Sequence, residues 1–322
     1  MFSVVVACST LTEKPSEISD KAYYHYIRAY NMELSGDRDG AMKEYNEALL
    51  HDPGSPYLRT QIAYLHVRAG NINEALSIAE EVVKERPDNV RALMLLGDIY
   101  NSQKRTEDAL RTYRKVISID PKKQDAYLKT GTIYASQKNY TEALEVLETL
   151  LRFDSQNFMG HYYTGAINLE IKDYAKALEH FKRTVEIRPD FEAAHISMGY
   201  IYETEEKYDE AIKEYKRAGE INPHNGDVQA RLAQIYIQQK SYDNALEALE
   251  RIIILDPDNL DVQFRMAMIF AEKKEYAKAV KKLRLISESR PADTRVKYYL
   301  GIILEETGDI KAAIEEFKKI IE

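Results

Sequence analysis

Apolar and polar residues alternate along the chain with the period of amphipathic helices. Segments such as EALEVLETLLRFDS (residues 142–155) place alanine and leucine at helical spacing, with charged residues between them. Short breaks separate these segments, and glycine stands in several of the breaks, at Gly36, Gly70 and Gly308. The pattern therefore predicts an all-α fold in which helices follow one another through short turns.

The helical pattern repeats every 34 residues. DALRTYRKVISIDP (108–121), KALEHFKRTVEIRP (176–189) and EAIKEYKRAGEINP (210–223) keep the same register. Extending this frame without insertion divides residues 22–322 into nine predicted units, which begin at residues 22, 56, 90, 124, 158, 192, 226, 260 and 294. Residues 1–21 lie outside the repeat and are predicted to form a truncated leader and a linker.

Three positions of the 34-residue unit indicate how each predicted pair of helices packs. Position 20 is alanine in all nine units, for example Ala41 and Ala143, and position 8 is always glycine or alanine, for example Gly97. Small residues at these positions let the two helices cross closely, so a larger side chain should cost about 1–3 kcal/mol. Proline at position 32, as in Pro121 and Pro189, ends the second helix because it cannot donate the backbone hydrogen bond.

With these positions the chain resembles the tetratricopeptide repeat family. The resemblance rests on the repeat length of 34, the small residues at positions 8 and 20, frequent tyrosine at position 11 (Tyr100 and Tyr134) and proline at position 32. It covers residues 22–322 but lacks the usual tryptophan at position 4, where residues such as His25 stand. The resemblance implies a right-handed α-solenoid of nine helix-turn-helix units, with the first helices lining a concave groove.

The charge and hydropathy of the chain exclude several other classes of protein. The net charge is −8 and no basic run of the kind that follows phosphates is present, so nucleic acid is not expected as a ligand. No apolar run reaches the roughly 18 residues that a membrane-spanning helix needs. Cys8 is the single cysteine of the sequence, so an intrachain disulfide is impossible.

The sequence contains no pattern typical of a catalytic or metal centre. Glycine-rich phosphate loops and nucleophile elbows are absent. His161 and His195 share position 4 of adjacent repeats, but no carboxylate or cysteine joins them at ligand spacing, so they are expected to be helix-packing residues rather than a metal pair. We therefore predict a protein that is not an enzyme and uses no cofactor and no metal.

The resemblance implies that function lies in the groove, because positions 2, 5, 9, 12 and 13 of the first helices point into it in this family. Many of these positions carry apolar or aromatic residues that folding does not require, and such a surface usually marks an interaction site. Tyrosine suits this role, since it offers a large contact area with few torsions to fix. The candidate partner-binding residues are Tyr23, Tyr26, Tyr30, Tyr57, Tyr64, Met94, Asp98, Leu128, Met159, Tyr162, Ile196, Tyr200, Phe264, Met268 and Tyr298.

Charged residues at the same positions predict the character of the ligand, a protein or peptide. Acidic residues outnumber basic ones by ten to three, which predicts an apolar segment with basic flanks. Chaperone-binding members of the family hold a C-terminal carboxylate with lysine at position 5 and asparagine at position 9, and neither occurs here. The acidic residues are Glu33, Asp98, Asp125, Glu170, Glu203, Asp227, Asp261, Glu272, Glu305 and Glu306, and the basic ones are Arg68, Arg91 and Arg295.

The N-terminal segment suggests a membrane tether. Val5-Val6-Ala7-Cys8 resembles the lipobox of bacterial lipoproteins, in which the cysteine is lipidated, and a polar linker follows. The preceding residues are too few for a complete signal peptide and carry no positive charge, so the alternative is a free cysteine in a disordered tail. The lipobox predicts a protein of the bacterial cell envelope that is lipid-anchored at Cys8, with Ser9 favouring the outer membrane; a cytoplasmic protein is the alternative.

Two functional hypotheses remain open. The leading one is a scaffold that holds partner proteins during envelope assembly. The sequence stops at Glu322, and the last predicted helix carries Ile314, Phe317, Ile320 and Ile321 without a covering helix. Either the native protein continues or this C-terminal face docks on something, for example a second copy. The alternative function is therefore the repeat arm of a larger enzyme, such as a glycosyltransferase, whose catalytic domain lies beyond residue 322.

Overall fold

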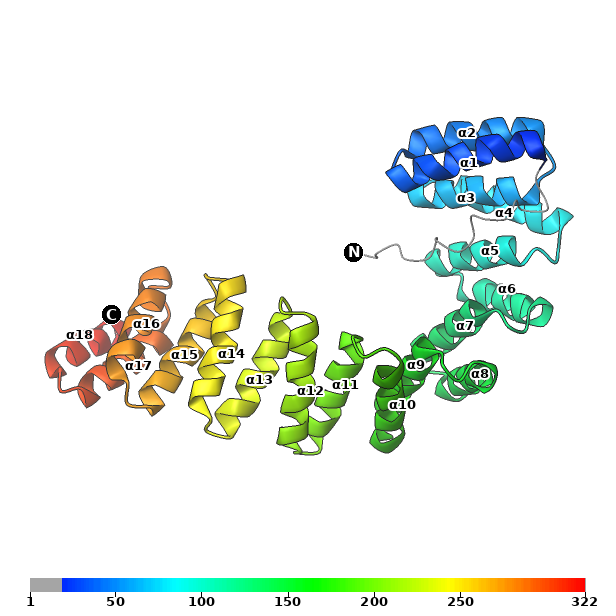
Figure 1. Ribbon diagram of the computed structural model, residues 1–322. Helices are drawn as coiled ribbons and strands as arrows, with labels where there is room; N and C mark the ends of the chain where they lie inside the picture. The colour runs from blue at the N-terminus through cyan, green and yellow to red at the C-terminus, as the bar shows by residue number, and fades with distance from the viewer. Residues whose placement is uncertain (1–18, 322) are drawn as a thin grey trace. The chain divides into compact units, whose positions relative to one another are not determined.

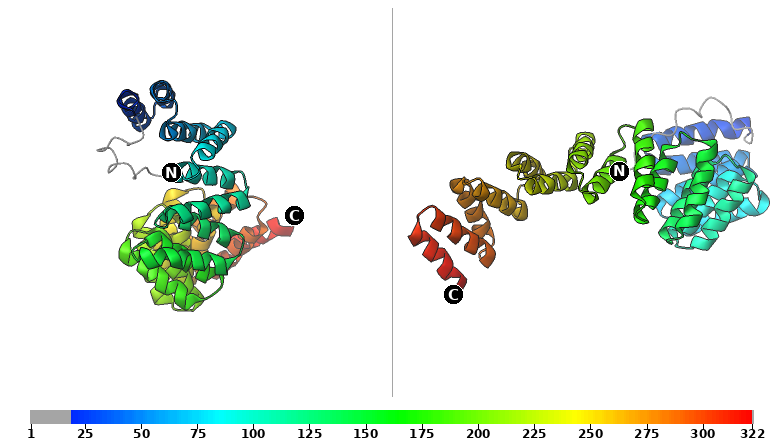
Figure 2. Two further views of the ribbon diagram at one scale, coloured as in Figure 1. Left: turned by 90° about the vertical axis from the view of Figure 1, so that its right-hand side faces the viewer. Right: turned by 90° about the horizontal axis from the view of Figure 1, so that it is seen from below.

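The computed structural model describes residues 19–321, and every regular element among them is a helix (Figure 1). The eighteen described helices follow one another as pairs joined by short turns, as two further views show (Figure 2). This arrangement confirms the predicted all-α solenoid fold. The sequence that resembles a lipobox lies outside the described residues.

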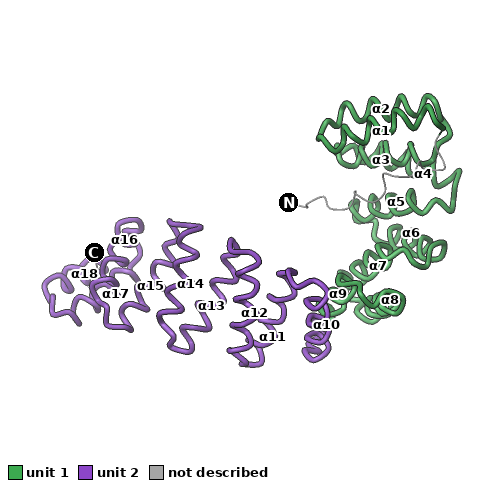
Figure 3. Tube along the Cα trace, viewed as in Figure 1, with its two compact units in different colours: residues 1–167 green, residues 168–322 purple. Residues whose placement is uncertain are grey.

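The chain divides into two compact units, residues 1–167 and residues 168–322 (Figure 3). The division falls within α9 (Phe158–Glu170). The helices before it are α1 (Asp20–Ser35), α2 (Arg38–His51), α3 (Pro56–Ala69), α4 (Ile72–Glu85), α5 (Val90–Ser102), α6 (Thr106–Ile119), α7 (Gln124–Ser136) and α8 (Tyr140–Phe153). The helices after it are α10 (Tyr174–Ile187), α11 (Glu192–Thr204), α12 (Tyr208–Ile221), α13 (Gly226–Gln238), α14 (Tyr242–Leu255), α15 (Leu260–Glu272), α16 (Tyr276–Ser289), α17 (Thr294–Glu306) and α18 (Ile310–Ile321).

The turn inside each pair has the same backbone conformation at position 15 of the repeat. Gly36, Gly70 and Gly308 have φ of 84°, 83° and 82°, the left-handed conformation in which glycine ends a helix without strain. The sequence pattern located the break through these glycines. In the other six 34-residue repeats a residue other than glycine takes the same conformation, with φ between 56° and 63°. These residues are Lys104, Lys138, Lys172, Glu206, Lys240 and Lys274.

The two helices of a pair cross closely at position 8. A Cβ atom added to Gly97 would lie 2.5 Å from the Tyr113 ring, and one added to Gly199 would lie 2.8 Å from the Tyr215 ring. The alanines at position 20 are all buried, which completes the close crossing. The prediction that these positions must be small is confirmed, because the space beyond them is filled by a large side chain of the second helix.

In two repeats a histidine at position 4, where the family's tryptophan is missing, makes a polar contact. His25 Nδ1 lies 2.8 Å from Glu44 Oε2, and His195 Nδ1 lies 2.7 Å from Glu214 Oε2. Each of these hydrogen bonds joins the first helix of a pair to the second, at position 23 of the same repeat. His195 is buried, so its hydrogen bond satisfies a polar group that would otherwise be costly inside the protein.

Candidate partner-binding surface

Four tyrosines of unit 1 form a cluster on α1 and α3. The Tyr26 ring lies 5.9 Å from Tyr23, 6.4 Å from Tyr30 and 5.4 Å from Tyr57, and its hydroxyl lies 2.8 Å from the Tyr57 hydroxyl. Tyr26 is only 8% exposed, and burial together with this hydrogen bond raises its pKa. Tyr26 is therefore a buried residue on which the other three rings pack, while Tyr23, Tyr30 and Tyr57 remain partly exposed. Tyr24 is 60% exposed, and its ring lies 5.2 Å from that of His25.

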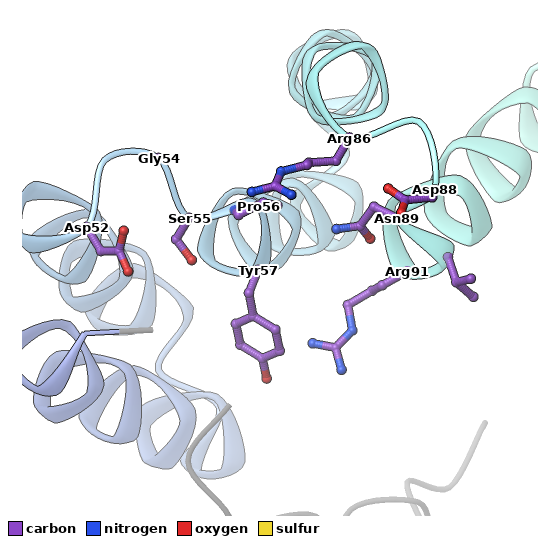
Figure 4. Close-up of a pocket in the computed structure, with 10 residues that line it drawn as sticks. Asp52, Gly54, Ser55, Pro56, Tyr57, Arg86, Asp88, Asn89 and Arg91 are labelled. Carbon is purple, nitrogen blue, oxygen red and sulfur yellow. The ribbon is translucent and has the colours of Figure 1, made fainter. Parts of the chain in front are cut away.

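An open pocket of about 830 Å³ lies beside this cluster, between the loops that precede α3 and α5 (Figure 4). Figure 4 shows the Tyr57 ring and the Arg91 side chain pointing to the same side, and the guanidinium carbon of Arg91 lies 4.3 Å from the ring centroid. The stacked pair joins two successive first helices across this surface. The pocket is lined by Asp52, Gly54, Ser55, Pro56, Tyr57, Arg86, Asp88, Asn89, Val90 and Arg91.

The predicted groove carboxylate Asp98 is partly exposed but is engaged by other groups of the protein. The Tyr113 hydroxyl donates a 2.5 Å hydrogen bond to Asp98 Oδ1, and Lys129 Nζ lies 2.8 Å from the same oxygen. Burial and this hydrogen bond raise the pKa of Tyr113. Tyr64 is half-buried near Asp98, and burial raises its pKa to about 12.

The same tyrosine–carboxylate–cation arrangement, which we name the triad, occurs twice more. Glu33 accepts a hydrogen bond of 2.7 Å from Tyr45 and pairs with Arg68 at 2.9 Å. Glu203 accepts one of 2.8 Å from Tyr215 and pairs with Arg231 at 3.4 Å. In each triad the cation comes from the next helix pair, so the triad ties two successive pairs together.

The triads reduce the number of groove carboxylates that are available to pair with a basic ligand. Their carboxylates, Glu33, Asp98 and Glu203, account for three of the ten acidic residues. Asp261 is also paired, with Arg290 at 3.1 Å, and Asp125 lies 3.7 Å from Lys123. The expected attraction for a basic ligand therefore rests on the remaining half of the set.

Unit 2 has a pocket of about 660 Å³ on its first helices. Two of the predicted site residues line it, Ile196 at position 5 and Tyr200 at position 9 of the same repeat. Leu169, Val228 and Ala230 extend the apolar wall, and the remaining lining residues are Ser197, Tyr215, Asn225, Asp227, Arg231, Gln234 and Arg265. The structure thus brings residues of positions 2, 5, 9 and 12 from three helices, α9, α11 and α13, to one recess.

Two arginines of this pocket were missed by sequence reasoning, which did not include position 6 among the groove positions. Arg231 and Arg265 are 34 residues apart and occupy that position in successive repeats. The guanidinium of Arg231 lies 6.0 Å from the centroid of the Tyr200 ring and pairs with Glu203, whereas Arg265 has no ion pair or hydrogen bond within residues 19–321. The recurrence of arginine at one repeat position was the sequence signal that could have identified the pair.

A second aromatic cluster lies near the end of unit 2. The rings of Phe264 and Tyr299 are 5.5 Å apart, those of Tyr298 and Tyr299 are 5.7 Å apart, and Arg295 lies 4.5 Å over Phe264. Tyr298 is 52% exposed, so this cluster presents an aromatic surface to solvent. Met268, also predicted, is partly buried and packs against the core of unit 2.

The other predicted residues offer less surface. Met94 is 6% exposed and belongs to the core, because position 5 of that repeat is covered by neighbouring helices. Leu128, Met159 and Tyr162 are half-buried, and burial raises the pKa of Tyr162. Ten of the fifteen predicted site residues lie in unit 1, from Tyr23 to Tyr162, and five lie in unit 2.

Residues 19–321 contain no cluster of three or more histidine, cysteine, aspartate or glutamate side chains arranged to hold a metal ion. None of the helices described in the structure combines the length and the apolar character that a bilayer crossing requires.

Models of known protein families match most of the residues that form the helix pairs. Family models described as tetratricopeptide repeat match residues 60–124, 100–159, 171–226, 203–269, 237–300 and 294–322. The chain belongs to the tetratricopeptide repeat family. Tetratricopeptide repeat proteins bind protein or peptide partners, so the chain is a protein-interaction scaffold, and repeat scaffolds of this kind are generally non-catalytic.

Solved structures of other tetratricopeptide repeat proteins share the fold. The C-terminal part of a repeat-containing protein from Cytophaga hutchinsonii is 18% identical over 74% of this chain and 97% of its own, with a TM-score of 0.60. PilF of Pseudomonas aeruginosa is 18% identical over 66% and 97%, with a TM-score of 0.55. PilW, a type IV pilus biogenesis factor, is 18% identical over 65% and 97%, also with a TM-score of 0.55. No curated protein sequence matches the chain.

Proposed function

We propose that the chain is a non-enzymatic scaffold that binds an apolar segment of a partner protein on the first helices of unit 2. The pocket that Ile196 and Tyr200 line carries this proposal, since it is a recess with an apolar wall that folding alone does not require. Tyr200 is 42% exposed, so its ring is available for contact. A side chain inserted beside Ile196 would remove apolar surface from water, which is the main source of affinity in such contacts.

The charges around the apolar wall support a ligand with charged flanks. Glu272, Glu305 and Glu306 are exposed and have no ion pair within the part of the chain that the structure describes, so basic residues of the ligand fit beside them. Arg265 lies at the pocket and is also unpaired, so it fits an acidic group at the other end of the bound segment. The proposed ligand is therefore apolar, with basic residues toward α15 and α17.

Site-specific photo-crosslinking in the native host tests the groove. A photo-reactive amino acid at Tyr200 should capture a partner protein, whereas the same group at Ile254, a 77% exposed residue of α14, should not. Substitution of Ile196 by glutamate should abolish the crosslink at Tyr200 without changing the helical circular dichroism. Equal capture at Tyr200 and Ile254, or capture that survives Ile196→Glu, would contradict the proposal.

We also propose that the scaffold acts in the bacterial cell envelope, held by a lipid on Cys8. The Val5-Val6-Ala7-Cys8 sequence supports this location. Mass spectrometry of the native protein tests it, because an acylated N-terminal cysteine adds a defined mass, and a Cys8→Ser variant should then leave the membrane fraction. An unmodified cysteine in a cytoplasmic fraction would refute the anchor.

Self-association through the C-terminal face is a further proposal. Ile310 and Ile314 of α18 are 51% and 49% exposed, and Ile321 is 87% exposed, which leaves an apolar stripe on this helix. Analytical ultracentrifugation should show a dimer that Ile314→Lys converts to a monomer. A wild-type protein that sediments as a monomer at all concentrations would refute this contact.

A further inference from the structure

A cluster of cations lies on α16 and the turn before it. Residues 273–284 contain six basic residues and one acidic residue, Glu275, although the whole chain has a net charge of −8. α16 is the second helix of its pair, so this cluster is separate from the first helices that carry the proposed groove. The six basic residues are Lys273, Lys274, Lys278, Lys281, Lys282 and Arg284.

Three of these cations are partly neutralised or bonded within the protein. Lys273 and Lys278 pair with Glu275 at 2.9 Å and 2.6 Å, and Lys273 also pairs with Asp243. Lys282 donates a hydrogen bond of 2.5 Å to Gln263 Oε1. These contacts fix the positions of the three side chains.

Lys281 and Arg284 are exposed and differ from these three bonded cations. Neither has an ion pair or hydrogen bond within residues 19–321. Both lie within one helical turn of Leu285, which is 46% exposed, and Glu288 follows Arg284 by one turn. We name Lys278, Lys281, Lys282, Arg284 and Leu285 the basic face.

The basic face surrounds a recess with an apolar floor. A pocket of about 650 Å³ is lined by Phe270, Ala277, Val280 and Leu285, with the cations of the basic face and Glu288 around them. Lys278 Nζ lies 5.2 Å from the centroid of the Phe270 ring, so this cation stands at the edge of the apolar floor. An apolar floor beside the unpaired cations Lys281 and Arg284 suits a ligand that presents an apolar side chain between carboxylates.

We propose that the basic face is a second docking surface, which binds an acidic amphipathic segment of a protein. The carboxylates of the segment pair with Lys281 and Arg284, and one of its apolar side chains enters the recess beside Leu285. The recessed floor favours a protein segment over an anionic lipid bilayer, because a flat bilayer surface would leave the recess unfilled. The charge of this ligand is opposite to that proposed beside Glu272, Glu305 and Glu306, so the scaffold would hold two different segments at once.

The probe for this surface is a synthetic helical peptide with leucines on one face and glutamates on the other, labelled for fluorescence anisotropy. The wild-type protein should bind it, with an affinity that falls as salt is raised. Lys281→Glu combined with Arg284→Glu should weaken binding by roughly tenfold or more, since both attractions become repulsions. Leu285→Ser should weaken binding at every salt concentration, because it removes the apolar contact.

Lys213→Glu is the matched control. Lys213 occupies on α12 the same repeat position that Lys281 occupies on α16, and it is likewise exposed and unpaired within residues 19–321. This variant should bind the peptide as the wild type does, and all variants should keep the wild-type melting temperature. Equal binding by wild type and the double variant would overturn the proposal. So would binding to phosphatidylglycerol-containing vesicles, compared with phosphatidylcholine alone, in the absence of peptide binding, which would assign the face to lipid.

Discussion

Tyr215 donates a hydrogen bond of 2.8 Å to one carboxylate oxygen of Glu203, and the other oxygen lies 3.4 Å from Arg231. The tyrosine comes from α12, the carboxylate from α11 and the arginine from α13. A residue assigned by sequence to ligand binding is thereby part of the framework between two helix pairs.

We expect Tyr215→Phe to lower the free energy of unfolding by about 1–3 kcal/mol, because a largely buried carboxylate loses its hydroxyl donor. Urea denaturation followed by circular dichroism measures the change. Tyr242→Phe is the control, since the Tyr242 hydroxyl has no hydrogen bond within residues 19–321, and it should change stability by less than about 0.5 kcal/mol. Equal effects of the two substitutions would show that the triad contributes no stability.

Alkaline pH should destabilise the protein through the same residues. Burial, followed by hydrogen bonding to a carboxylate, raises the pKa of Tyr45, Tyr113 and Tyr215. The raised pKa contributes stability that is complete below the ordinary tyrosine value of about 10 and is lost as pH rises from there through the higher folded-state values. The free energy of unfolding should therefore fall above about pH 10, and a variant with phenylalanine at all three positions should show a shallower fall. A pH-independent stability between pH 9 and 11, about one unit either side of the ordinary value, would contradict this assignment.

Substitutions at position 8 should differ according to the side chain they meet. The added Cβ of Gly97→Ala would lie 2.5 Å from the Tyr113 ring, which its hydrogen bond to Asp98 holds in place. The added Cβ of Gly131→Ala would lie 2.9 Å from Leu147, whose flexible end can rotate away. We expect Gly97→Ala to destabilise by about 1–3 kcal/mol and Gly131→Ala by less, as thermal and urea denaturation would measure. The reverse order would show that ring anchoring does not limit this crossing.

Two opposite substitutions at position 15, glycine for lysine and lysine for glycine, test the strain of the left-handed backbone conformation there. Lys138 has φ of 63°, so Lys138→Gly relieves backbone strain and should stabilise the protein by about 0.5–1 kcal/mol after the entropy of glycine in the unfolded chain is counted. Gly70 has φ of 83° and open space around its Cα, so Gly70→Lys should destabilise by a similar amount. Denaturation curves of both variants measure the pair, and changes of the same sign would refute the strain argument.

The sequence predicted the helices and their close crossings because these depend on residues that recur in the repeat. Alanine at position 20 and glycine at position 8 make their contacts inside one 34-residue repeat. Their spacing in the sequence is therefore enough to identify the points where the helices cross. The positive φ of Lys138 could not be predicted from its own residue type, because lysine rarely adopts this conformation. Only the glycines at the same position of other repeats indicate the turn.

The candidate site was predictable in position but not in exposure. Ile196 and Tyr200 line a pocket as their repeat positions suggested, yet Tyr26 and Met94 at equivalent positions are buried. The burial of a groove residue depends on the side chains that the adjacent 34-residue repeat places against it, and the repeat pattern does not specify those side chains. The role of Glu203 was hidden for the same reason, since its partners Tyr215 and Arg231 belong to other helices.

The three triads also determine where the protein would yield under mechanical tension. Within unit 1, they link α1 and α2 to α3, and α5 and α6 to α7; within unit 2, the triad of Glu203 links α11 and α12 to α13. A pulling force applied along unit 2 would meet a largely buried carboxylate, Glu203, at that junction. At the junctions between α14 and α17 it would meet the Lys273–Asp243 ion pair, whose carboxylate is 88% exposed and screened by water, and the Arg295–Phe264 contact. Rupture should therefore begin among the later helix pairs, and a scaffold loaded by its partners would lose those pairs first while the pocket beside Tyr200 stays folded.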